Sequence, residues 1–292
     1  MTDIVLTGPS GFTNNIKISP TVSNNDLVVT ILTSTGGTPS STDPAMVRIG
    51  ITDRYITTAL SVTKADGTNW ANLGSAELGT KETDLFLYAV WNTNLTPDAV
   101  DIFWSRYPYG RLYSDFSSTT TNEKYAAING TAPASTDECV VIGRFAATLS
   151  LSGTSHLWTV PTYTNINLIH QPITNTRMLT WQPVASAVGG GSFSISTTDL
   201  ATYQIDKNWL STEIHVVGTV TGTVTAVGLT APFESLWISS TLPIGNSKVS
   251  GGLLGNAEMA AGTPDIIRHF KYDGSAFSTG ASVVKSIGRY EI

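Results

Sequence analysis

The densest group of side chains that could do chemistry lies in one stretch, 104–116. It contains five aromatic residues and two arginines in thirteen positions. Aromatic rings stack on the apolar faces of sugars, arginines donate hydrogen bonds to hydroxyls, and tyrosine and arginine are also enriched at protein interfaces. The candidate receptor or interface contacts are Trp104, Arg106, Tyr107, Tyr109, Arg111 and Tyr113. Three interpretations stay open: Trp104 and Phe116 in the core with a folded tyrosine loop, a subunit interface, or a glycan contact.

Two acidic pairs near aromatic residues could supply general acid and base chemistry. They are Glu82 with Asp84, and Asp98 with Asp101. Glycoside hydrolysis uses two carboxylates, and alternate positions of a strand share one face. The same spacing also occurs at ordinary polar strand ends, and no parallel β-helix repeat accompanies it. We therefore expect no catalytic role for these carboxylates.

Metal ligands and nucleophiles are sparse in this chain. The four histidines, His156, His170, His215 and His269, have no second ligand close in sequence, so we expect surface or interface histidines and no metal site. Cys139, the single cysteine, lies in the apolar run CVVIG and is expected to be a buried, inert thiol. Neither a nucleophile elbow nor a phosphate-binding loop is present. The sequence predicts a protein that is not an enzyme and needs no cofactor.

The composition of the chain limits the classes of partner that it is expected to bind. Charged residues make up 13% of the chain and hydrophobic residues 41%, and the net charge is −6 with 16 Lys+Arg. Because no basic stripe could neutralise phosphates, nucleic acid is not an expected partner. No apolar run reaches the roughly 18 residues of a membrane helix, and no secretory signal is recognisable at the start. We expect a chain made in a cytoplasm, without membrane insertion.

Alternation of apolar and polar residues predicts strands over 27–32, 46–51, 55–62, 84–91, 99–104 and 139–149. Short helical candidates are 122–128 and 165–170. The prediction is an all-β fold with two antiparallel β-sandwich (jelly-roll-like) domains. Their expected bounds are 1–160 for an N-terminal β-domain that includes an attachment segment, 161–183 for a linker, and 184–292 for a C-terminal β-sandwich module. Gly189-Gly190-Gly191 predicts a flexible turn, and 218–225 a hairpin or a strand edge.

Two sets of segments resemble structural proteins of tailed bacteriophages. DLFLYAVW at 84–91, VDIFW at 100–104 and VVIGRF at 140–145 follow one another as in a recurrent module of phage structural proteins. RMLTWQP at 177–183, YQI at 203–205 and the stretch 218–232 are similar to small sandwich modules at the ends of tail or head fibres. The resemblance implies a virion location, a jelly-roll-like sandwich and trimerisation.

The sequence thus predicts a non-enzymatic structural component of a tailed-phage virion: a short tail fibre, a head fibre or an adaptor that attaches to the particle and contacts the host surface. The expected partners are two further copies in a homotrimer, other virion proteins of the tail, neck or capsid, and a host surface glycan. The alternative is a tip module that binds or degrades glycans, as a receptor-binding protein or depolymerase does. The C-terminal domain is expected to be the exposed tip.

Overall fold

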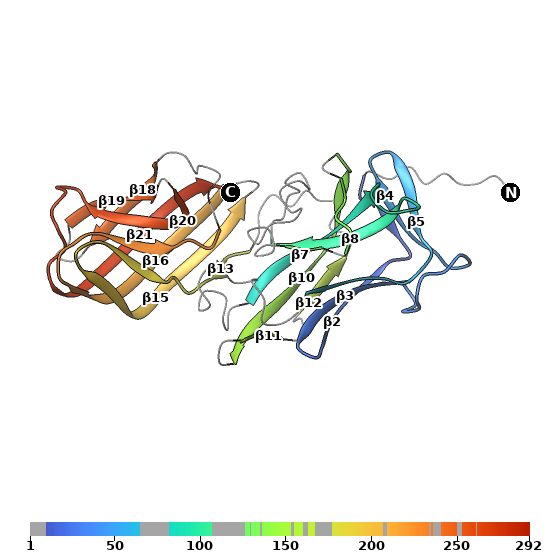
Figure 1. The fold of residues 1–292 in the computed structure, drawn as a ribbon, viewed down its shortest axis with the longest axis horizontal. Helices are drawn as coiled ribbons and strands as arrows, with labels where there is room; N and C mark the ends of the chain where they lie inside the picture. The colour runs from blue at the N-terminus through green and yellow to red at the C-terminus, as the bar shows by residue number, and fades with distance from the viewer. Residues whose placement is uncertain are drawn as a thin grey trace. The chain divides into compact units, whose positions relative to one another are not determined.

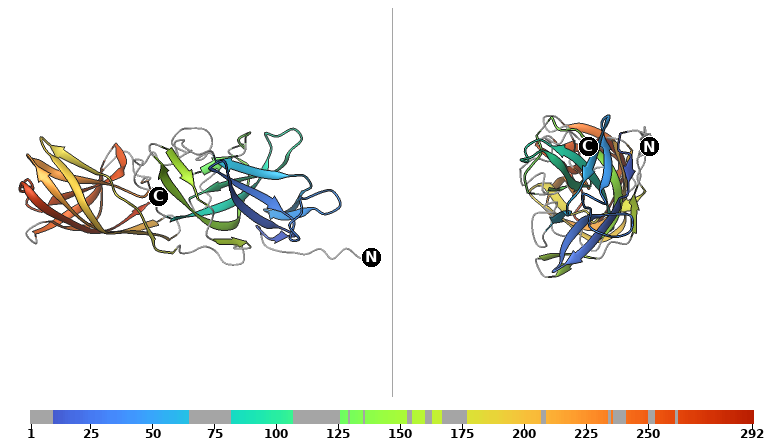
Figure 2. Two further views of the ribbon diagram at one scale, coloured as in Figure 1. Left: turned by 90° about the horizontal axis from the view of Figure 1, so that it is seen from below. Right: turned by 90° about the vertical axis from the view of Figure 1, so that its right-hand side faces the viewer.

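The computed structural model describes residues 10–64, 82–106, 126–128, 130–134, 136–152, 155–159, 163–166, 177–206, 209–233, 235, 241–249, 253–260 and 262–292. They form two compact units, one containing the described residues up to 166 and the other those from 177 onward. Every regular element among them is a strand, and every sheet is antiparallel (Figure 1). Figure 2 shows the same strands from two further sides. The predicted all-β fold with antiparallel β-sandwiches is confirmed.

The first unit contains three sheets. Two are three-stranded, in the orders β1-β4-β5 and β2-β3-β6, and the third is six-stranded, with β11-β10-β7-β8-β9 in line and β12 beside β10. The strands of the two small sheets are β1 (Thr13–Asn14), β4 (Ala45–Ile49), β5 (Thr52–Ile56), β2 (Lys17–Ser23), β3 (Asp26–Leu32) and β6 (Leu60–Lys64). Those of the large one are β7 (Glu82–Asn92), β8 (Ala99–Ser105), β9 (Ala126–Ile128), β10 (Cys139–Ser152), β11 (Ser155–Trp158) and β12 (Tyr163–Ile166).

Burial along the strands shows which faces are covered. In β3 the buried residues alternate with half-buried ones, as expected of a strand with one face on the core. In β7 every residue from Thr83 to Val90 is buried. A strand covered on both faces has this continuous apolar pattern, and β4 lies in contact with β7. Strand β7 is therefore the centre of the first unit.

Aromatic rings fill the core on the two faces of β7 and β8. Tyr88 and Phe103 are cross-strand partners, and their rings stack with centroids 4.9 Å apart. Trp104 meets Phe145 edge-on at 6.1 Å and Trp158 edge-on at 5.6 Å. Edge-on and stacked pairs at these distances add to the stability that burial provides.

The structure corrects some predicted elements. The strand expected over 55–62 is two strands, β5 and β6, which belong to different sheets. The helices expected over 122–128 and 165–170 are wrong wherever residues are described: Ala126–Ile128 is β9, and Asn165 and Ile166 belong to β12. Pairing with β8 and β10 overrides a weak helical preference there. The domain bounds remain predictions, although β12 and β13 (Leu179–Thr180) lie inside the stretch expected to be a linker.

The second unit is one nine-stranded antiparallel sheet, in the order β13-β15-β16-β21-β18-β19-β20-β17-β14. Its other strands are β14 (Ala185–Gly189), β15 (Ser192–Asp206), β16 (Trp209–Thr221), β17 (Val224–Thr230), β18 (Leu242–Val249), β19 (Leu253–Ala260), β20 (Thr263–Lys271) and β21 (Gly280–Glu291). We call it the curled sheet, because β14 at one end of the order lies in contact with β15 near the other end. The concave face encloses the core.

Two sharp turns close the curled sheet. Strands β14 and β15 join through the predicted glycine turn, and Gly189 has a φ of +109°, which glycine adopts without strain. A Cβ atom on Gly191 would overlap the carbonyl oxygen of Thr221, the last residue of β16. Strands β16 and β17 do not pair with each other, so a hairpin over 218–225 is wrong. The chain instead crosses between distant strands of the sheet there.

A second aromatic cluster lies at one end of this core. Trp181 is buried, meets Tyr203 at 6.0 Å, and donates its indole N–H to the carbonyl of Thr230 at 3.0 Å. Tyr203 in turn meets Phe233 at 5.7 Å, and the hydroxyl of Tyr290 donates to the carbonyl of Phe233 at 3.0 Å. The tryptophan of the segment TWQP thus ties the start of this unit to β17, and Phe233 and Tyr290 extend the cluster to the last strand.

Candidate functional site

The predicted aromatic contacts divide into two groups. Trp104 and Arg106, at the end of β8, are 0% and 1% exposed, and the indole of Trp104 packs between Phe145 and Trp158. For Trp104 the core interpretation therefore holds. The others lie outside the described residues: Tyr107, Tyr109, Arg111 and Tyr113. For these four, contact with a receptor or a subunit stays a prediction.

One carboxylate of each acidic pair, Asp84 and Asp101, has a structural partner. Asp84 accepts a hydrogen bond from the guanidinium of Arg144, which also lies 5.8 Å from the ring of Phe86. Asp101 accepts a hydrogen bond from the side-chain amide of Asn92 at 3.1 Å. Both carboxylates are buried, at 2% and 3% exposure. Buried charges need such partners, so these two groups stabilise the first unit.

His269 is not the surface residue that the sequence suggested. It is fully buried inside the curled sheet, with Nδ1 3.2 Å from the carbonyl oxygen of Val227 and Nε2 2.9 Å from the hydroxyl of Ser286. Burial lowers the pKa of His269 to about 4, so the ring is neutral at pH 7. Since a carbonyl only accepts, Nδ1–H donates to Val227 and Nε2 accepts from Ser286. The ring links β17, β20 and β21 across the core.

Cys139 begins β10 and is partly covered. Burial raises the pKa of its thiol to about 11. Because the thiolate is the reactive form, a thiol with this pKa is a poor nucleophile at neutral pH. This agrees with the inert thiol predicted from the sequence, but Cys139 is only half-buried and not buried as predicted.

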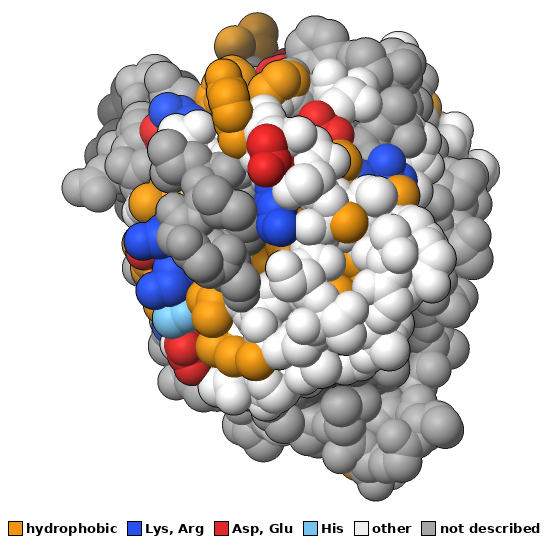
Figure 3. All heavy atoms as spheres, turned by 90° about the vertical axis from the view of Figure 1, so that its left-hand side faces the viewer, with side chains coloured by type: hydrophobic (Ala, Val, Ile, Leu, Met, Phe, Trp, Pro, Cys, Tyr) orange, Lys and Arg blue, Asp and Glu red, His pale blue; other side chains and the backbone are white. Residues whose placement is uncertain are grey.

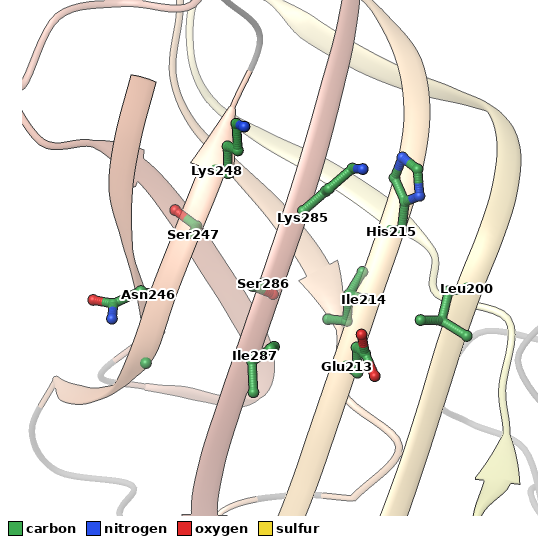
Figure 4. A pocket seen from close by; sticks show the side chains of 11 residues that line it. Leu200, Glu213, Ile214, His215, Asn246, Ser247, Lys248, Lys285, Ser286 and Ile287 are labelled. Carbon is green, nitrogen blue, oxygen red and sulfur yellow. The ribbon is translucent and has the colours of Figure 1, made fainter. Parts of the chain in front are cut away.

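The surface feature best suited to binding lies on the curled sheet. An open hollow of about 630 Å³ extends across β15, β16, β21 and β18. Figure 4 shows the side chains that line it, and in it Lys248, Lys285 and His215 stand in a row across three strands. Seen in space-filling form, basic and histidine side chains gather at one edge of this end of the second unit, beside acidic and hydrophobic ones (Figure 3).

Strand register explains this arrangement. His215 on β16 is directly opposite Lys285 on β21, and Lys285 is directly opposite Lys248 on β18. We call these three residues the basic row. Two positions along each strand, Glu213 is opposite Ile287, and Ile287 is opposite Asn246. Because side chains alternate between faces with a period of two, both rows project from the same outer face.

The polar and apolar groups of the hollow are accessible. Lys248, Lys285, Glu213 and Asn246 are exposed, and Ile287 is 69% exposed, a large value for an isoleucine. The ring nitrogen Nδ1 of His215 lies 3.4 Å from a carboxylate oxygen of Asp199. The hollow therefore offers positive charge along one row and, along the other, hydrogen-bonding groups on either side of an apolar side chain.

Sequence reasoning missed the hollow. Two of its strands, β15 and β16, are consecutive in the chain, but β21 and β18, which continue the hollow in the sheet, come much later in the sequence. The alternation at 213–217 does indicate that Glu213 and His215 share a face. No local signal shows that Lys248 and Lys285 lie beside them.

Across the described ranges, no group of three or more histidine, cysteine, aspartate or glutamate side chains could hold a metal ion. Nor is any helix in those ranges long and apolar enough to cross a membrane.

Comparison with known proteins assigns no family: no family model matches the chain, and no curated protein matches it.

Proposed function

We propose that this chain is a non-enzymatic structural component of a tailed-phage virion: a short tail fibre, head fibre or adaptor that attaches to the particle and contacts the host surface. The observation that carries the proposal is the architecture. Two antiparallel β-units follow one another in one chain, and each has its own aromatic and aliphatic core. The resemblance of segments from both units to phage structural modules supports the same role.

The titratable groups of the described cores also fit a structural role. Asp84, Asp101 and His269 are held by hydrogen bonds inside the chain. Groups so engaged fix the positions of strands, whereas an acid or base in a catalytic site must reach a substrate. These three buried groups therefore serve the fold.

The surface suits packing against other subunits. Only 13% of residues are charged, so an interface between copies would bury few charged side chains. At the turn between β4 and β5, Ile51 is 97% exposed, and Tyr55 nearby is 59% exposed. These side chains could be covered by a neighbouring virion protein. We include a homotrimer in the proposal, because closed symmetry is the usual form of homo-oligomers and a three-fold axis suits a fibre.

Two measurements on the full chain test this proposal. Phage particles should be purified from the organism that produces this chain, and mass spectrometry should detect the chain in them as a stoichiometric component. Light scattering of the purified protein should give three times the 31.0 kDa mass of one chain. A monomer in solution together with absence from purified particles would contradict the proposal.

A further inference from the structure

The basic row is an unfavourable arrangement that folding alone does not explain. The chain has 16 Lys+Arg and a net charge of −6, yet it places two lysines, Lys248 and Lys285, directly opposite each other on adjacent strands. Like charges directly opposite on a sheet destabilise it. Such a placement is expected where an anion binds between the like charges.

The two lysines of the row are available to a ligand. In the part of the chain that the structure describes, neither Lys248 nor Lys285 makes a hydrogen bond or an ion pair, and both are exposed. His215 differs, because Asp199 lies 3.4 Å from its ring. That carboxylate holds one side of the ring and leaves the two ammonium groups as the principal anion-binding donors.

The rest of the hollow indicates what accompanies the anion. Asn246 and Glu213 can donate and accept hydrogen bonds with hydroxyl groups. Ile287, exposed between them, offers an apolar surface, and Leu200 on β15 lines the hollow two strands away. The ligand that satisfies all three features has a negative group, several hydroxyls and an apolar face. A volume of about 630 Å³ is within the range of small-ligand sites.

We propose that the hollow formed by β15, β16, β21 and β18 binds an acidic saccharide, with the sugar carboxylate between Lys248 and Lys285 and the sugar face on Ile287. This goes beyond the proposed structural function, because it assigns a ligand class to a specific surface of the second unit. The saccharide proposal is also independent of the structural one, because the site can be tested on the purified chain whether or not the chain belongs to a virion.

Charge in and around the hollow disfavours other acidic ligands. Glu213 lies two positions along its strand from His215, so a second anionic group at that distance would meet a carboxylate. An acidic peptide or a nucleic acid carries such repeated charges, and the net charge of −6 opposes a long polyanion. A saccharide instead presents hydroxyl groups at that distance, and the Glu213 carboxylate accepts hydrogen bonds from them.

The test uses an array of carboxylate-bearing oligosaccharides, each beside its carboxyl-reduced counterpart, in which a hydroxymethyl group replaces the carboxylate. Sulfated oligosaccharides and a glutamate-rich peptide are further arms. The full-length protein should bind one or more carboxylate-bearing members at least about tenfold more tightly than the reduced counterpart, because a charge-assisted hydrogen bond is lost on reduction. Binding to none of the carboxylate-bearing members, or equal binding to the reduced forms, overturns the proposal. Tighter binding of the sulfated sugars or of the peptide also overturns it.

Variants locate the site. Lys285→Gln should weaken binding about tenfold or more, while thermal unfolding is unchanged or shifts upward because a like-charge contact is removed. Arg289→Gln is the matched control: Arg289 is an exposed basic residue further along the same strand, near Asp206 and outside the hollow. Its binding should equal that of the wild type. If Lys285→Gln binds as tightly as Arg289→Gln, the saccharide site is not this hollow.

Discussion

Acidification should destabilise the second unit through one residue, His269. Its ring is fully buried, with both nitrogens hydrogen-bonded, and its pKa in the folded protein is about 4. In the unfolded chain the imidazole titrates near 6.5. Between these two values the unfolded chain binds a proton that the folded protein does not bind. The free energy of unfolding therefore falls as the pH is lowered through this window.

The size of the effect follows from the pKa difference. One pKa unit corresponds to about 1.4 kcal/mol, so a shift from 6.5 to about 4 corresponds to about 3 kcal/mol. The full stability is present above pH 6.5, falls progressively below it, and the loss is complete below about pH 4. Glu258 acts in the opposite direction, because burial raises its pKa and the folded form binds that proton more readily. Comparison with a variant removes this and every other background contribution.

The assay is urea unfolding at intervals between pH 7 and pH 4, for the wild type and for His269→Gln. Glutamine cannot ionise in this range but keeps an amide donor and an acceptor. The variant is expected to be less stable at pH 7, because its hydrogen bonds fit less well, and to lose less stability on acidification. The difference between the two proteins should shrink by about 3 kcal/mol from pH 7 to pH 4. A constant difference across this range would refute the buried, neutral ring.

Three more outcomes test the packing. In chemical denaturation, Gly191→Ala should lower the free energy of unfolding by about 1–3 kcal/mol, since the added Cβ overlaps the backbone oxygen of Thr221. Gly190→Ala, whose added Cβ would have nothing within 4 Å, should change it by less than about 0.5 kcal/mol. Asp84→Ala should lower the free energy of unfolding by about 3 kcal/mol or more, because it leaves a partly buried arginine without its carboxylate. Asp206→Ala, which breaks an exposed ion pair at 3.6 Å, should lower it by less than about 1 kcal/mol. Equal losses would contradict the difference between the buried and the exposed ion pair. Cys139 should react with a thiol reagent about one hundredfold more slowly in the native protein than in the unfolded chain at neutral pH, and similar rates would disprove the raised pKa.

The local pattern of apolar residues was sufficient to predict several individual strands. The apolar runs at 27–32, 84–91, 99–104 and 139–149 correspond to β3, β7, β8 and β10. The all-β class followed because these runs are short, alternating or β-branched, and bounded by glycine and polar turns. The helical candidates failed, because short segments without strong periodicity adopt whatever conformation their neighbours in the sheet require.

Positions that depend on long-range pairing could not be predicted. Strands β16 and β17 are adjacent in sequence and separated in the curled sheet, so the run at 218–225 resembles a hairpin and is not one. The basic row likewise requires three strands from distant parts of the chain to lie side by side. His269 is different, because the alternation in β20 places it on the same face as Ile267, which is fully buried. That signal was present locally.

The most direct test of the central claim is electron microscopy of purified phage particles labelled with an antibody against this chain. A structural component should give label at one fixed position on the tail, neck or head of every particle, and label at the outer end would identify the second unit as a tip if the antibody recognises that unit. Unlabelled particles, with the chain recovered only as free protein from the same lysate, would contradict a role in the virion.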